Sequence, residues 1–187
     1  MEIDKINNLL ELFFIQYKKQ DKNNIFLNSL KDQSKKYSWE DTFTNVLKLS
    51  NEISKYINKG DRCLIISENR PEWLITDLSI MMAYGITVPA YTTYTERDYE
   101  YIIEDCNPSL IFVSDLIQYE KIRNIIPKKD FIKKVIIFDP IKNLIISLIL
   151  SPIVMYIVLL VAKSSGAAYE MSHGDTFIIW LNGNFNK

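Results

Sequence analysis

The chain has 187 residues, which is enough for one domain with a sizeable core. Its 22 basic and 23 acidic side chains leave a formal net charge of -1, which excludes a broad electrostatic attraction to nucleic acid. With a single histidine, His173, and no Cys-x-x-Cys pair, the sequence gives no support to a zinc site. Cys63 and Cys106 lie in or beside apolar elements, so we expect small buried side chains in a reducing compartment.

The first sixty residues predict two helices separated by two short strands. An apolar stripe over residues 9–17 indicates a helix that packs on the domain. Residues 25–30 and 35–39 are typical of short, paired strands around a polar turn. An amphipathic pattern then predicts a helix over residues 40–58. We expect its apolar face to carry Phe43, Val46, Leu47, Ser50, Ile53 and Ile57.

A strand, a turn, a helix and a second strand are predicted next, by the sequence GDRCLIISENRPEWLITDLSIMMAYGITVPAY. The apolar run at 63–66 fits a strand that is buried on both faces. Asn69 can accept hydrogen bonds from the free amides at a helix start, and Pro71 suits the first helical turn. We expect Trp73 to lie in the core, Gly85 to end the helix, and residues 86–91 to form the second strand.

The following segment predicts two more strands and two more helices. Thr95 and Asp98 have the spacing of a capping box at a helix start, and Asn107 with the proline after it marks the end of that helix. The later elements are a strand at 110–113, a helix at 116–126 and a strand at 135–138. Since apolar runs alternate with helices, we expect an α/β fold with a helix-covered, mostly parallel sheet.

An uncharged run occupies residues 143–162, NLIISLILSPIVMYIVLLVA. Twenty helical residues span about 30 Å, which matches the hydrocarbon core of a bilayer, and Pro152 is tolerated in membrane helices. We therefore expect a transmembrane helix that anchors a cytoplasmic domain. Two other interpretations stay open, namely two buried core segments broken at Ser151, or the product of a truncated or rearranged reading frame. The orientation rests on Lys128, Lys129, Lys133, Lys134 and Lys142, which precede the run.

Four blocks of residues carry a likeness to one enzyme family. They are Tyr37-Ser-Trp-Glu40; Gly60-Asp-Arg62 with Ser67-Glu-Asn-Arg-Pro-Glu-Trp73; Ala83-Tyr-Gly85 with Val88-Pro-Ala-Tyr91; and YIIEDCNPSLIFVS from Tyr101 to Ser114. In this order the blocks resemble the adenylate-forming synthetase superfamily, and within it the long-chain fatty acyl-CoA synthetases. The resemblance covers residues 24–139.

The resemblance implies a reaction in two steps. A fatty acid carboxylate attacks the α-phosphate of ATP to give an acyl-adenylate and pyrophosphate, and a thiol, usually that of CoA, then displaces AMP. Such chemistry needs backbone amides of a Ser/Thr/Gly-rich loop, a lysine and Mg²⁺ around the phosphates. The matched blocks are mostly scaffold in the family, and we interpret Tyr91, Tyr94, Tyr99 and Tyr101 as packing residues. We therefore assign no catalytic, cofactor-binding or metal-binding residue.

A phosphate-binding loop is not evident among the five glycines, since no two of them are close enough to form one. The run from Asp175 to Gly183 resembles the family's acidic residue, apolar strand and first loop glycine. However, Leu181 and Asn182 stand where hydroxyl side chains would be expected, and Lys187 is better explained as a coincidence than as the loop lysine. ATP, Mg²⁺ and CoA are thus cofactors of the family that this chain is not expected to bind alone.

These observations predict a particular organisation. Residues 1–140 would form a truncated AMP-binding N-terminal subdomain, 141–163 an apolar segment and 164–187 a short tail. The chain would be an N-terminal fragment of a long-chain fatty acid–CoA ligase, inactive alone, whose partner is the rest of the synthetase on another chain. The alternative is a membrane-tethered binding or remnant module that derives from the same family and has no catalytic role.

Overall fold

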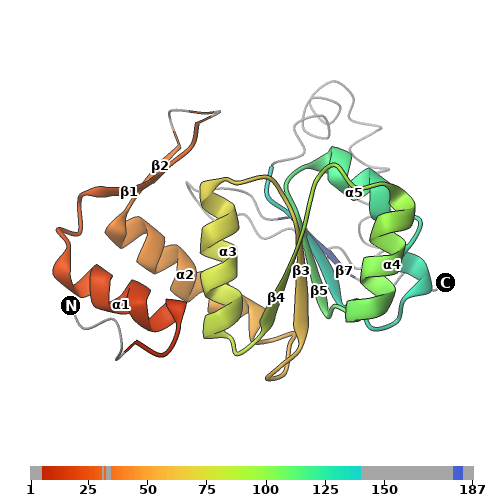
Figure 1. The fold of residues 1–187 in the computed structure, drawn as a ribbon, viewed down its shortest axis with the longest axis horizontal. Coiled ribbons are helices and arrows are strands. Elements are labelled where there is room, and N and C mark those ends of the chain that lie inside the picture. The colour runs from red at the N-terminus through yellow and green to blue at the C-terminus, as the bar shows by residue number, and fades with distance from the viewer. Residues whose placement is uncertain (1–5, 31, 33–34, 140–178, 183–187) are drawn as a thin grey trace, which may run out of the picture. The chain divides into compact units, whose positions relative to one another are not determined.

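The computed structural model describes residues 6–30, 32, 35–139 and 179–182, which fall into two compact units (Figure 1). The first unit comprises Met1–Asp61 with Glu68–Thr87, and the second comprises Arg62–Ser67 with Val88–Lys187. The expected α/β architecture is confirmed, because parallel strands alternate with helices along the described chain.

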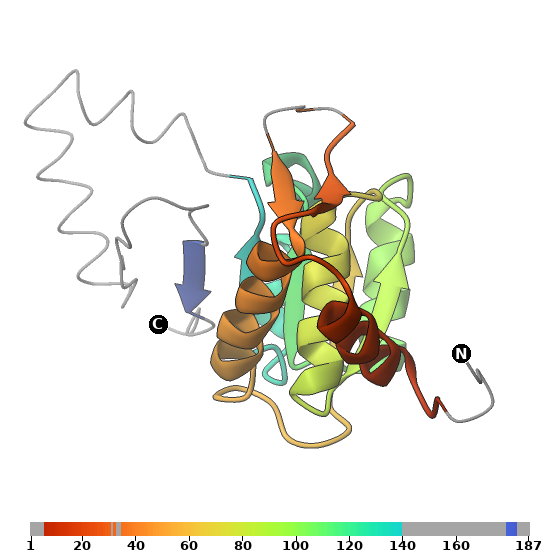
Figure 2. The ribbon, with the colours of Figure 1, turned by 90° about the vertical axis from the view of Figure 1, so that its left-hand side faces the viewer.

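The first unit packs three helices with a small hairpin. Its elements are α1 (Leu9–Lys19), β1 (Ile25–Asn28), β2 (Lys36–Ser38), α2 (Trp39–Ile53) and α3 (Pro71–Met82). The strands β1 and β2 pair antiparallel, as expected, and Figure 2 shows this hairpin at the start of α2. The core joins all three helices through Phe13, Val46, Ile75 and Leu78. Within it the buried hydroxyl of Ser79 donates to the carbonyl of Ile75 at 2.6 Å in its own helix.

The helix α2 starts and ends earlier than the pattern predicts. Trp39 belongs to the helix and not to the strand, because Ser38 and Asp41 form a capping box just before and within its first turn. The helix ends at Ile53, where the Ser54 hydroxyl bonds the carbonyl of Asn51 and the chain tightens into a turn. Leu47, expected on the apolar face, is exposed.

The second unit is built on a five-stranded sheet with the order β4-β3-β5-β6-β7. The strands are β3 (Arg62–Ile66), β4 (Ile86–Ala90, of which the last three residues belong to this unit), β5 (Leu110–Val113), β6 (Lys134–Ile137) and β7 (Ile179–Asn182). β3, β5 and β6 pair in parallel, and β7 pairs antiparallel with β6. The four apolar residues 63–66 are completely buried, as the sequence predicts.

Helices α4 (Glu96–Cys106) and α5 (Leu116–Ile122) pack against this sheet, as Figure 1 shows. The predicted capping box of Thr95 and Asp98 is present, and Asn107 ends α4 in the left-handed conformation. α5 is shorter than the predicted helix over 116–126. Pro127 has no amide hydrogen with which to continue the helix. The amide of Ile125 instead donates to the carbonyl of Ile122 at 2.9 Å, and the 3₁₀ turn η2 (Ile126–Lys128) follows.

Two expectations for the start of α3 were wrong. Asn69 does not cap the helix, because the N-cap position falls one residue later, on the extended backbone of Arg70, which makes no side-chain cap bond. Pro71 does occupy the first helical turn. Trp73 is half-buried rather than a core residue. The interior of this helix is instead provided by Ile75, Leu78 and Ile80.

No helix within residues 6–30, 32, 35–139 and 179–182 is long and apolar enough to cross a membrane. The transmembrane helix expected at 143–162 lies outside these residues. Lys128 and Lys133, which supported its orientation, lie before the amino end of β6, whereas the chain runs on towards residue 143 from the carboxyl end of the same strand.

Gly85 follows α3, but it is Tyr84 that takes the left-handed backbone there, with φ 62. What requires glycine at 85 is close packing, because a Cβ would lie 2.8 Å from Cδ1 of Ile57 and 2.9 Å from Cγ2 of Ile80. We expect Gly85→Ala to lower the free energy of unfolding by about 1–3 kcal/mol through overpacking. Urea denaturation measures this, with the exposed Lys59→Ala as control; a Gly85→Ala midpoint equal to that of the wild type would contradict the packing argument.

Candidate functional site

Among the described residues, Glu72 is the one buried residue with a charged side chain. It lies in the first turn of α3. Its side chain is only 10% exposed. Pro71 starts the helix, so the carboxylate of the following residue lies near the free amides and positive end of the helix dipole. A buried carboxylate must be paired or neutralised, and the structure shows which cations pair with it.

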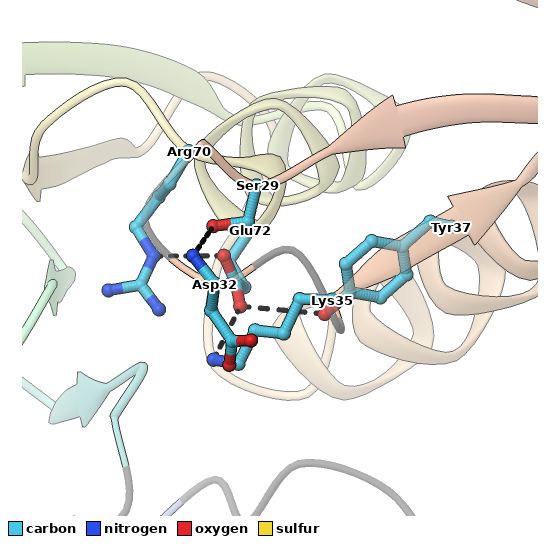
Figure 3. Close-up of polar contacts among 6 residues, drawn as sticks. All are labelled: Ser29, Asp32, Lys35, Tyr37, Arg70 and Glu72. Carbon is cyan, nitrogen blue, oxygen red and sulfur yellow. Dashed lines mark hydrogen bonds and ion pairs between the residues drawn. The ribbon is translucent and has the colours of Figure 1, made fainter.

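Two basic residues and a tyrosine converge on this carboxylate, as Figure 3 shows. Arg70 Nε donates to Oε2 of Glu72 at 2.8 Å. Lys35 Nζ donates to the other oxygen, Oε1, at 3.2 Å, and the Tyr37 hydroxyl lies 3.4 Å from the same atom. Both carboxylate oxygens are therefore engaged. We call Lys35, Tyr37, Arg70 and Glu72 the Glu72 cluster.

The hairpin between β1 and β2 holds the lysine of this cluster in place. The backbone amide of Ser29 donates to the carbonyl of Lys35 at 3.0 Å, and the amide of Lys35 donates to the carbonyl of Asp32 at 2.9 Å. The amide of Asp32 in turn donates to the hydroxyl of Ser29 at 3.1 Å (Figure 3). A closed turn thus fixes the position from which Lys35 reaches α3.

Electrostatics keeps the carboxylate charged. Burial alone would raise the pKa of Glu72. The hydrogen bond from Arg70, the bond from its own backbone amide, and the charges of Arg70 and Lys35 outweigh burial and hold the pKa below its usual value. A carboxylate with a lowered pKa and two engaged oxygens is a poor proton acceptor. The Glu72 cluster therefore links the hairpin to α3.

The second unit offers the position where α/β sheets usually bind ligands. The chain passes from β3 to β4 on one side and then crosses back to β5, so the strand order reverses between β3 and β5. Ligands bind beyond the carboxyl ends of the strands at such a reversal. Ser67 and Ser114 occupy these ends; both are buried, and the amide of Ser114 donates to the carbonyl of Ile66 at 3.0 Å.

The described residues at this edge do not show the features of a phosphate-binding loop. The glycines among the described residues are Gly60 and Gly85, and both belong to turns of the first unit. β7 confirms the predicted apolar strand after Asp175, but Asn182 pairs with Lys134, so the chain leaves β7 at the amino edge of the sheet. Gly183 to Lys187 lie outside the described residues. The described side chains at this edge therefore do not fit ATP phosphates.

A metal centre is likewise not apparent in the part of the chain that the structure describes, where no three His, Cys, Asp or Glu side chains converge. Cys63 is buried and Cys106 is half-buried. Burial raises the pKa of the Cys106 thiol, which disfavours the reactive thiolate. The expectation of a buried side chain is thus confirmed for Cys63, whereas Cys106 is only half-buried.

A family model described as "AMP-binding enzyme" matches residues 14–147, which is more than half of the chain. This chain belongs to the AMP-binding enzyme family. The predicted membership of the adenylate-forming superfamily is confirmed by this match. Two of the four blocks that carried the resemblance, around Tyr37 and around Glu72, meet in the Glu72 cluster.

Curated relatives of this AMP-binding chain carry the names of fatty-acid-activating enzymes. It is 33% identical over 84 residues to "Long-chain-fatty-acid--CoA ligase" of Bacillus subtilis (strain 168), a match that covers 44% of this chain and 15% of the relative. It is 30% identical over 113 residues to "Long chain acyl-CoA synthetase 3" of Arabidopsis thaliana, covering 58% of this chain and 17% of the relative. The chain thus spans less than a fifth of the length of these two relatives.

Solved structures show the same fold. The anthranilate CoA ligase AuaEII, in complex with anthranoyl-AMP, superposes with a TM-score of 0.64 at 15% identity, over 73% of this chain and 26% of that chain. Apo MatB from Rhodopseudomonas palustris superposes with a TM-score of 0.58 at 22% identity, over 69% of this chain and 25% of that chain. At these identities the likeness concerns the fold alone.

The tyrosines of this AMP-binding chain divide into core and surface residues. Tyr99 is completely buried, and its hydroxyl donates to the carbonyl of Tyr91 at 2.7 Å. The ring of Tyr94 packs edge-on against the rings of Tyr91 and Tyr99. Tyr101, in contrast, is 70% exposed. The interpretation as packing residues thus describes Tyr94 and Tyr99 well, whereas Tyr101 and the side chain of Tyr91 face solvent.

Burial, with smaller contributions from Tyr94 and Asp98, raises the pKa of Tyr99 to about 12. The unfolded chain ionises this tyrosine near pH 10, so the stability that its neutral form provides is present below pH 10 and is lost as the pH rises towards 12. In a spectrophotometric titration, Tyr99→Phe should remove one phenol that ionises at about pH 12. Loss of a phenol that ionises near pH 10 would show that Tyr99 is hydrated in solution.

Proposed function

We propose that this chain supplies the N-terminal α/β portion of a long-chain fatty acid–CoA ligase. The family match over residues 14–147 supports an AMP-binding scaffold. The names of the Bacillus subtilis and Arabidopsis thaliana relatives support fatty acids as the substrate class. The whole ligase would use ATP, Mg²⁺ and CoA to make an acyl-adenylate and then a thioester, as the resemblance implies.

The role proposed for these 187 residues is structural. The Glu72 cluster ties the hairpin to α3, and the parallel sheet presents Ser67 and Ser114 at the strand-order reversal. Neither arrangement places a group of hydrogen-bond donors around the phosphates of ATP. In this proposal residues 1–140 are the subdomain proper, although the family match runs somewhat past residue 140. The apolar segment at 141–163 and the short tail at 164–187 are also part of the proposal.

We further propose that the 187 residues, by themselves, do not form an acyl-adenylate. Developing charge on the transferred phosphate needs several preorganised donors, and the sequence contains no Gly-rich loop that could provide backbone amides for it. The remaining part of the ligase fold would hold ATP and Mg²⁺, whether it belongs to another chain or to a longer form of this one. CoA and most of the fatty acid would be bound there too.

ATP–pyrophosphate exchange tests this proposal. The purified 187-residue chain is incubated with ATP, Mg²⁺, labelled pyrophosphate and fatty acids of several chain lengths, and the complete Bacillus subtilis ligase serves as positive control. We expect exchange above background only in the control. Exchange by the 187-residue chain that depends on fatty acid would overturn the proposal, because these 187 residues would then be sufficient for phosphate chemistry.

A further inference from the structure

The pairing of β6 and β7 fixes where the residues between them leave and return. Ile137, at the carboxyl end of β6, is the partner of Ile179, at the start of β7. The amide of Asp139 donates to the carbonyl of Ser114 at 3.0 Å, so the chain is still at the carboxyl edge of the sheet there. Asp139 and Ile179, which flank residues 140–178 in the chain, thus lie at the same edge of the second unit.

This topology conflicts with a single membrane crossing by residues 143–162. One crossing would separate the two sides by about 30 Å, whereas antiparallel neighbours lie about 5 Å apart. A return crossing would need about 20 further apolar residues. The stretch 163–178 is shorter than that and carries Lys163, Glu170 and Asp175. The pairing of β6 with β7 therefore favours a cover for the uncharged run other than a bilayer that it crosses once.

The carboxyl edge of the same unit carries exposed apolar side chains. Tyr91 is 72% exposed, Leu116 40% and Ile117 69%; we call these three residues the carboxyl-edge patch. The Tyr99 hydroxyl connects the segments that carry them, since it lies 2.7 Å from the carbonyl of Tyr91 and 3.3 Å from Oε1 of Gln118, the residue after Ile117. Exposed apolar side chains on neighbouring segments are typical of a contact surface.

We propose that residues 143–162 dock on the carboxyl-edge patch of their own chain. The run can reach the patch. The amide of Asp139 donates to the carbonyl of Ser114, two residues before Leu116, and the four residues from there to 143 span up to about 13 Å. Asp139 and Ile179, the described residues on either side of the run, both lie at this edge. Docking would remove from water an uncharged segment and three exposed apolar side chains together. The inference does not depend on the proposed enzymatic role.

Disulfide trapping in the full-length chain tests the docking. In a background of Cys63→Ala and Cys106→Ala, Ile117→Cys is combined in turn with Ser147→Cys, Ile149→Cys and Ile153→Cys. The matched control replaces Ile117→Cys by Lys128→Cys, an exposed position before the amino end of β6. Under mild oxidation we expect intramolecular cross-links with Ile117→Cys for at least one position of the run, and none with Lys128→Cys. Cross-linking at both positions, or at neither, would overturn the proposal.

Maleimide labelling keeps the proposal testable if the double variants misfold. In single variants of the same background, Ile117→Cys should react about tenfold more slowly than Lys128→Cys, and urea should abolish the difference. Equal rates in native buffer would overturn the proposal. Binding to lipid would overturn it as well. If the chain floats with neutral phospholipid vesicles and these protect residues 143–162, then lipid, and not the carboxyl-edge patch, covers the run.

Discussion

Replacing Glu72 by glutamine should lower the free energy of unfolding by about 2–3 kcal/mol, because the change leaves two cations beside a neutral group. Arg70 is only 12% exposed and cannot recover full hydration without moving away from α3. Lys35 is 30% exposed and is partly hydrated already, which places the cost below that of a fully buried pair. Urea denaturation of the full chain measures the loss.

A matched control is available in the same unit. Glu52 pairs with Lys55 at 2.6 Å, but the two side chains are 40% and 53% exposed. Exposed pairs contribute little, so Glu52→Gln should change the free energy of unfolding by about 0.5 kcal/mol or less. Equal losses for Glu52→Gln and Glu72→Gln would show that burial does not distinguish the two pairs, and would contradict the role given to the Glu72 cluster.

The loss should also depend on pH in a defined direction. The pKa of Glu72 is lower in the folded protein than in the unfolded chain, where a glutamate ionises near pH 4.3. Its stabilising contribution is therefore fully present above that pH and disappears as the pH falls through the folded pKa. We expect the difference between wild type and Glu72→Gln to be constant from pH 6 to 8 and to narrow below about pH 4.

Truncation of Phe112 should have a larger effect. This residue is completely buried in the middle of β5, where it is the ladder partner of Ile65 on one side and of Ile136 on the other. Phe112→Ala removes a large ring from a strand with two buried neighbours, and we expect a loss of about 3–5 kcal/mol. Denaturation followed by circular dichroism measures it.

The control for this second prediction is Tyr101→Ala, which removes an aromatic ring that is 70% exposed on α4. It should leave the denaturation midpoint almost unchanged, because little apolar area is removed from a buried environment. A loss below about 1 kcal/mol for Phe112→Ala would mean that the ring is not enclosed, and would place doubt on the sheet as the core of the second unit.

Elements whose signals lie within a few residues of one another could be predicted from the sequence. The capping box of Thr95 and Asp98 and the buried run of β5 depend on neighbouring side chains, and both are found as expected. The errors came where two local signals compete. Asn69 and Pro71 both favour a helix start, and the proline determines its position, so the cap falls on Arg70 instead. In the same way, Pro127 shortens α5.

The Glu72 cluster could not be predicted, because its members are far apart in the chain. Lys35 and Glu72 meet only after the hairpin and α3 have packed in the first unit. The sequence offered one usable signal, an acidic residue directly after the proline in the first turn of α3. Such a residue is buried only with cationic partners. Which cations serve as partners depends on tertiary packing, on which hydrophobic periodicity gives no information.

We propose that this chain is a working N-terminal portion of a fatty-acid-activating ligase, and a chimera tests this proposal most directly. The aligned N-terminal portion of the Bacillus subtilis ligase is replaced by its counterpart from this chain, and fatty-acid-dependent ATP–pyrophosphate exchange is measured. The same chimera with Glu72→Gln reports on the scaffold. We predict that the chimera exchanges pyrophosphate. Glu72→Gln should lower its thermal stability more than it lowers its activity at low temperature. A folded chimera without exchange would contradict the account.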